Sequence, residues 1–74
     1  MASREDAQTA VARMLLGRIR QDAHPSTTHM AILEETIPRA LVGEYLNILL
    51  EKVVNDPAPS IPMLRRIQRI AEQM

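Results

Sequence analysis

The chain contains no cysteine, no phenylalanine and no tryptophan, and its only aromatic residue is Tyr45. Without cysteine, neither a disulfide nor a thiolate-bound metal can stabilise the fold. A hydrophobic core built from this chain is therefore aliphatic. In a chain of 74 residues such a core supplies only ~3–5 kcal/mol of net stability, and small domains of this kind often gain buried area by binding another subunit. We expect one domain, residues 1–74, that forms a homo-oligomer, with a dimer as the simplest case.

The chain also has no excess charge of either sign, because nine basic side chains balance nine acidic ones. A balanced small protein has no overall field that attracts nucleic acid or an anionic membrane. No apolar run approaches the ~20 residues that cross a bilayer. The first residues, Met1 to Asp6, are polar and of mixed charge, unlike a signal peptide. We therefore expect a cytoplasmic protein that does not contact a membrane.

Catalytic motifs are missing as well. The sequence has no glycine-rich phosphate loop and no serine in a Gly-x-Ser-x-Gly setting. Neighbouring carboxylates occur at Glu34 and Glu35 and at Glu44 and Glu51, but such pairs on a helix surface are usually solvated. A short aliphatic chain also has little volume for a substrate pocket. We predict that the protein is not an enzyme and binds no cofactor.

Only Asp22, His24 and His29 have side chains of the metal-binding type close together in the sequence. The two histidines are five residues apart across a predicted turn, so they do not share a helix face as an i, i+4 pair does. No cysteine or third histidine completes a tetrahedral set of ligands. We predict no metal site.

What the chain does contain is a near-repeat with an offset of 34 residues. Met14-Leu15-Leu16 corresponds to Ile48-Leu49-Leu50, and Asp22-x-x-Pro25-Ser26 corresponds to Asp56-x-x-Pro59-Ser60. Each half is a long apolar segment, an Asp-x-x-Pro-Ser turn and a shorter amphipathic segment. The offset equals the length of a tetratricopeptide unit, but the tryptophan, Gly-x-x-Tyr and phenylalanine landmarks are absent, and two units are fewer than the ~3 that a solenoid needs. We interpret the repeat as two αα-hairpins with the same turn chemistry.

These patterns predict an all-α fold of four short helices, arranged as two αα-hairpins in a small helical bundle. Proline and capping residues set the helix ends. Ser26 or Thr27 caps the second helix and Ser60 caps the fourth, while Pro38 and Pro62 are expected in the first turns of the third and fourth helices, where a missing N–H is harmless. The predicted helices span about residues 4–21, 27–36, 38–55 and 60–73.

In the first helix, apolar residues recur with helical spacing. The stripe that we expect to be buried consists of Ala7, Val11, Met14, Leu15 and Ile19. Gly17 lies within the same helix, where glycine costs ~1 kcal/mol relative to alanine. We therefore expect that a neighbouring helix crosses close to Gly17.

The third predicted helix, residues 38–55, is the most apolar part of the chain. Its apolar side chains cover an arc of roughly 200°, whereas a surface helix needs only about 100°. The remaining helices, two of them short, cannot easily enclose such an arc, so we expect part of it to meet another subunit. Leu46, Leu50 and Val54 lie toward one edge and are the candidate interface residues. The sequence thus predicts a non-enzymatic protein–protein interaction or assembly module that self-associates through this helix.

Two alternatives remain open at this point. Arg65, Arg66 and Arg69 form the only basic cluster, and in a small dimeric regulator they would contact the phosphates of a nucleic acid. Charged residues opposite an apolar stripe are more often an ordinary solvated helix face, so this alternative ranks second. The other alternative is a structural subunit of a larger symmetric assembly, such as a phage or shell component.

Overall fold

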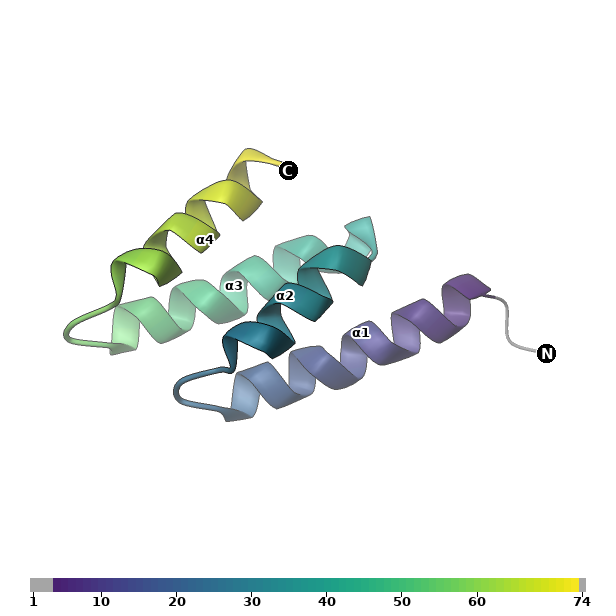
Figure 1. The fold of residues 1–74 in the computed structure, drawn as a ribbon, viewed down its shortest axis with the longest axis horizontal. Coiled ribbons are helices and arrows are strands. Elements are labelled where there is room, and N and C mark those ends of the chain that lie inside the picture. Colours follow the sequence, from purple (N-terminus) through teal and green to yellow (C-terminus); the bar gives the residue numbers. More distant parts are fainter. Residues whose placement is uncertain (1–3, 74) are drawn as a thin grey trace. The chain divides into compact units, whose positions relative to one another are not determined.

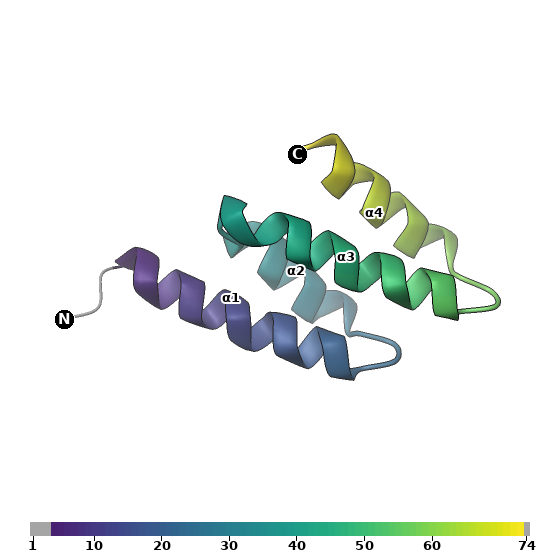
Figure 2. The same cartoon turned by 180° about the vertical axis from the view of Figure 1, so that it is seen from behind.

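The computed structural model describes residues 4–73, which form four helices and contain no strand (Figure 1). Two of these helices, α1 and α2, lie side by side and are joined by a short turn, and α3 and α4 form a second hairpin of the same kind (Figure 2). The predicted all-α fold with two αα-hairpins is confirmed. The bounds of the helices are Arg4–Gln21 for α1, Thr27–Thr36 for α2, Arg39–Asn55 for α3 and Ile61–Glu72 for α4.

The two hairpins belong to two compact units, Met1–Ala40 and Leu41–Met74. Each unit has its own buried apolar residues, and no polar or charged side chain is buried within the described part of the chain. The prediction of one domain over residues 1–74 stays a prediction. The buried residues of the first unit are Ala12, Leu16, Ile19, Met30 and Leu33, and those of the second are Leu41, Tyr45, Ile48, Leu49 and Ile70.

Both shorter helices begin with the same capping bond. The backbone N–H of His29 donates to Oγ of Ser26 over 3.3 Å, and the backbone N–H of Met63 donates to Oγ of Ser60 over 3.2 Å. Both serines have extended backbone angles, as a residue that precedes a helix should. The predicted caps at Ser26 and Ser60 are confirmed, and the sequence repeat corresponds to a repeat of hydrogen bonds.

The predicted start of the third helix is wrong by one residue, because α3 begins at Arg39 and Pro38 precedes it. The physical reason lies in the residue before the proline. Ile37 has φ −63° and ψ 128°, an extended conformation that proline favours in its predecessor. The N–H of Ile37 still donates to the carbonyl oxygen of Leu33 over 2.7 Å, which closes the end of α2. Pro62 lies in the first turn of α4, as predicted, and α4 is one residue shorter at each end than expected.

The predicted buried stripe of the first helix is largely wrong. Of its five residues only Ile19 is buried; Leu15 is half-buried, and the others, Ala7, Val11 and Met14, are exposed. α1 instead buries Ala12, Leu16 and Ile19, which follow the same i, i+4, i+7 spacing on another side of the helix. Ala12 has only a methyl group, so a neighbouring helix can approach α1 closely at this position. The predicted helical spacing of the buried residues is confirmed, but the predicted side of α1 is wrong.

The predicted close crossing at Gly17 is also wrong. A Cβ atom added at Gly17 would have no neighbouring atom within 4 Å. At 100° per residue, Gly17 lies roughly 140° around the helix from Ala12, on the side that faces away from the buried residues. The glycine therefore serves no packing purpose within this hairpin.

Candidate interaction surfaces

The uncovered edge of the apolar arc of α3 consists of Leu46, Leu50 and Val54, which we call the α3 seam. Leu46 is half-buried, whereas Leu50 is 41% exposed and Val54 is 80% exposed. These residues are four positions apart and so follow one edge of the helix. The opposite side of α3 is buried, through Leu41, Tyr45, Ile48 and Leu49. The three residues predicted from the sequence thus lie together, and two of them are open to solvent.

The second hairpin exposes two further apolar residues that the sequence did not single out. Ile61 is 66% exposed and Leu64 is 43% exposed, and both belong to α4. Helical spacing groups Leu64 with Ile70 on one broad apolar face, but these positions are about 120° apart around the helix, and only Ile70 is buried. Ile61 carries no such signal, because it is the first residue of its helix.

α1 has a second apolar side, which we call the α1 outer face. Its members are all exposed and lie away from the buried residues of the helix: Ala7, Ala10, Val11, Met14 and Gly17. Basic residues lie on and beside this face, at Arg13, Arg18 and Arg20. Arg18 also approaches Asp22, with 4.0 Å between Nε and Oδ2. An apolar helix face bordered by arginine is available for contact with another surface.

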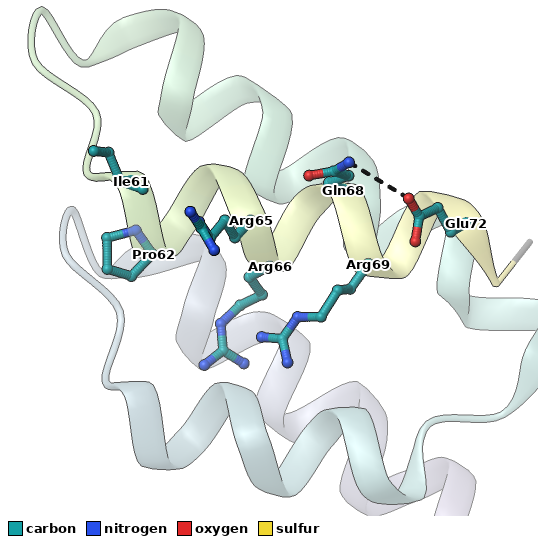
Figure 3. Close-up of a pocket in the computed structure, with 7 residues that line it drawn as sticks. All are labelled: Ile61, Pro62, Arg65, Arg66, Gln68, Arg69 and Glu72. Atoms are coloured by element: carbon teal, nitrogen blue, oxygen red, sulfur yellow. Dashed lines mark hydrogen bonds between the residues drawn. The ribbon is translucent and has the colours of Figure 1, made fainter.

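The basic cluster lies on α4, where Arg65, Arg66 and Arg69 line a shallow groove together with residues of the same helix (Figure 3). Arg65 and Arg69 are exposed, and Arg66 is half-buried. Glu72 lines the same groove, and its Oε1 atom accepts a hydrogen bond from Nε2 of Gln68 over 3.4 Å. The groove therefore carries three positive charges and one negative charge.

Other chemistry-bearing residues do not form a site in the part of the chain that the structure describes. No group of three or more histidine, aspartate and glutamate side chains there is arranged to hold a metal ion. His24 is exposed, and Nδ1 of the half-buried His29 lies out of contact with solvent without a hydrogen-bond partner. Over the described residues, no helix is both long enough and apolar enough to cross a membrane.

Comparison of the chain with protein-family models, with curated proteins and with solved structures gave no match.

Proposed function

We propose that this chain is a non-enzymatic interaction module that associates with a second copy of itself through the α3 seam. The observation that carries the proposal is the exposure of Leu50 and Val54 on a helix whose other large apolar residues are buried or half-buried. Complete burial of one such side chain stabilises a protein or a complex by ~1.5–3 kcal/mol. Burial of two such side chains in an interface would therefore contribute substantially to the free energy of association.

The surroundings of the α3 seam support this proposal. Ile61 and Leu64 are exposed on α4, the other helix of the same hairpin, so both helices of this unit expose apolar side chains. Specific interfaces usually have such an apolar centre and a polar rim. Asn47 and Glu51 are exposed on α3 beside the seam and supply polar groups for a rim.

The test is the oligomeric state of the double variant Leu50→Glu/Val54→Glu. Placing two carboxylates in an apolar interface is costly, so we expect the dissociation constant of the dimer to rise at least about 100-fold. Sedimentation velocity over a concentration series measures this change. The control is Ile32→Glu, which introduces one glutamate at an exposed apolar residue of α2, outside the seam, and should leave the dissociation constant unchanged. A wild-type protein that is monomeric at millimolar concentration contradicts the proposal.

A second candidate function is favoured by one observation, the grouping of Arg65, Arg66 and Arg69 along one groove of α4. In a dimer, two copies of this groove would present six arginines to the phosphates of a nucleic acid. Binding to duplex DNA would then weaken steeply as salt is added, and Arg→Gln changes at these positions would reduce the slope. Glu72 in the same groove places this candidate second. In the same concentration series, particles larger than a dimer would indicate the structural alternative, a subunit of a closed ring or a filament, in which copies associate head to tail.

A further inference from the structure

Among the residues that the structure describes, each hairpin leaves an apolar side of its long helix exposed, the α1 outer face on the first hairpin and the α3 seam on the second. We infer that they bind each other between copies: the partner of the α3 seam is the α1 outer face of a second copy of this chain. This inference rests on the proposed function and adds the identity of the surface that covers the seam. The contact is heterologous, because each copy uses one surface to bind and offers the other to be bound.

The repeat shows that the α1 outer face is of a kind that helices bury. Adding 34 to the residue numbers relates Ala7, Val11 and Met14 of α1 to Leu41, Tyr45 and Ile48 of α3. All three of these α3 residues are buried. The equivalent side of the helix is thus buried in one hairpin and exposed in the other. In proteins built from helical repeats, an end unit that stays monomeric has a polar outer face. The α1 outer face is apolar, so a further hairpin is its expected neighbour.

Charge decides which surface of the second copy is the better fit. Arg13, Arg18 and Arg20 lie on or beside the α1 outer face, where the exposed acidic residue is Asp6. Glu51 is exposed on the polar side of α3, beside the seam. Contact between two α3 seams would bring carboxylates of both copies to one interface, and contact between two α1 outer faces would do the same with guanidinium groups. Contact between unlike surfaces brings opposite charges together, and charge complementarity of this kind selects the partner and its orientation.

The experiment is a complementation test between two association-deficient variants. The first, Val11→Glu/Met14→Glu, lacks the α1 outer face, and the second, Leu50→Glu/Val54→Glu, lacks the α3 seam. If the contact is heterologous, each variant alone is a monomer. An equimolar mixture restores one complete interface and gives a particle of twice the monomer mass, which native mass spectrometry resolves. We expect each variant alone to associate roughly 100-fold more weakly than the mixture.

The alternatives give different results. If Val11→Glu/Met14→Glu still self-associates while Leu50→Glu/Val54→Glu does not, the seams bind each other; the proposed function then stands and this inference is wrong. If the wild-type chain is a monomer, the proposed function itself is wrong. If both variants are monomers and their mixture is too, the heterologous contact is excluded.

Folding of the variants is checked by their helical circular dichroism. Where a glutamate pair prevents folding, the neutral pairs Val11→Gln/Met14→Gln and Leu50→Gln/Val54→Gln replace it in the same test.

Salt provides an independent measurement on the wild-type chain. Association between unlike charges weakens from 50 mM to about 500 mM salt, by several-fold, whereas contact between two acidic seams would strengthen over the same range. The control variant Ile32→Glu keeps both surfaces, so it should self-associate like the wild-type chain and bind each deficient variant.

Discussion

The two hairpins have equivalent turns, but their long helices, α1 and α3, bury different sides of the repeated apolar pattern. Ser26 and Ser60 make equivalent capping bonds, yet the long helices bury different sides of the repeated pattern. Leu16 is 4% exposed in α1, whereas Leu50, 34 positions later, is 41% exposed in α3. The reverse holds for Met14, which is 66% exposed, and for Ile48, which is buried. Local turn chemistry therefore determines where a helix begins, and the neighbours of the helix determine which apolar side is covered.

The largest expected difference between the hairpins is between the equivalent residues Leu16 and Leu50, of which the first is buried and the second exposed. We expect Leu16→Ala to destabilise the fold by ~2–5 kcal/mol, because it leaves a cavity at a buried position. Leu50→Ala should cost less, about 1 kcal/mol or below, once the chain is dissociated. Urea titration at several protein concentrations measures both changes.

Dilution supplies the control for this prediction. The cost of Leu16→Ala should not depend on protein concentration, whereas the cost of Leu50→Ala should shrink as the chain is diluted, because a subunit contact stabilises by mass action. Equal costs at every concentration would mean that the two hairpins bury the same side of the pattern after all.

Removing the capping serine should destabilise the two hairpins equally. Ser26→Ala and Ser60→Ala should each lower the free energy of unfolding by ~1 kcal/mol, since each leaves one N–H at the start of a helix without its side-chain acceptor. Ser→Asp at the same positions keeps an acceptor and should restore most of the loss. A loss at only one of the two serines, seen by thermal unfolding, would show that the repeated turns are not energetically equivalent.

The smallest expected effect is a gain in stability at Gly17. Gly17→Ala should raise the free energy of unfolding by ~0.5–1 kcal/mol, because alanine loses less backbone entropy in a helix and its Cβ would meet no atom within 4 Å. The melting temperature reports the change. A destabilised variant would show that a close neighbour occupies this side of α1.

The sequence predicted the helices well because their ends depend on a few neighbouring residues. Ser26, Ser60 and the prolines act through bonds and clashes within three or four positions, and the helix ends were correct to within one residue. The position of Pro38 was missed because a proline fits both the residue before a helix and its first turn.

The sequence could not show which side of α1 is buried. Ala12, Leu16 and Ile19 have the same spacing as Ala7, Val11 and Met14, so periodicity gives both sides equal weight. Which side is buried depends on how α2 packs against α1, and that contact is not encoded in the periodicity of α1. The α3 seam was easier to predict, because an arc too wide for its neighbours has to leave an edge exposed, although the contribution of Ile61 and Leu64 was not foreseen.

Exposure of Met14 makes the α1 outer face chemically vulnerable. Its thioether is open to peroxide, whereas that of Met30, 3% exposed, is shielded. Oxidation would turn the apolar side chain of Met14 into a polar sulfoxide and leave the buried core of the hairpin unchanged. If the α1 outer face binds a second copy, oxidised preparations should keep their helices and lose affinity between copies, and a methionine sulfoxide reductase should restore it.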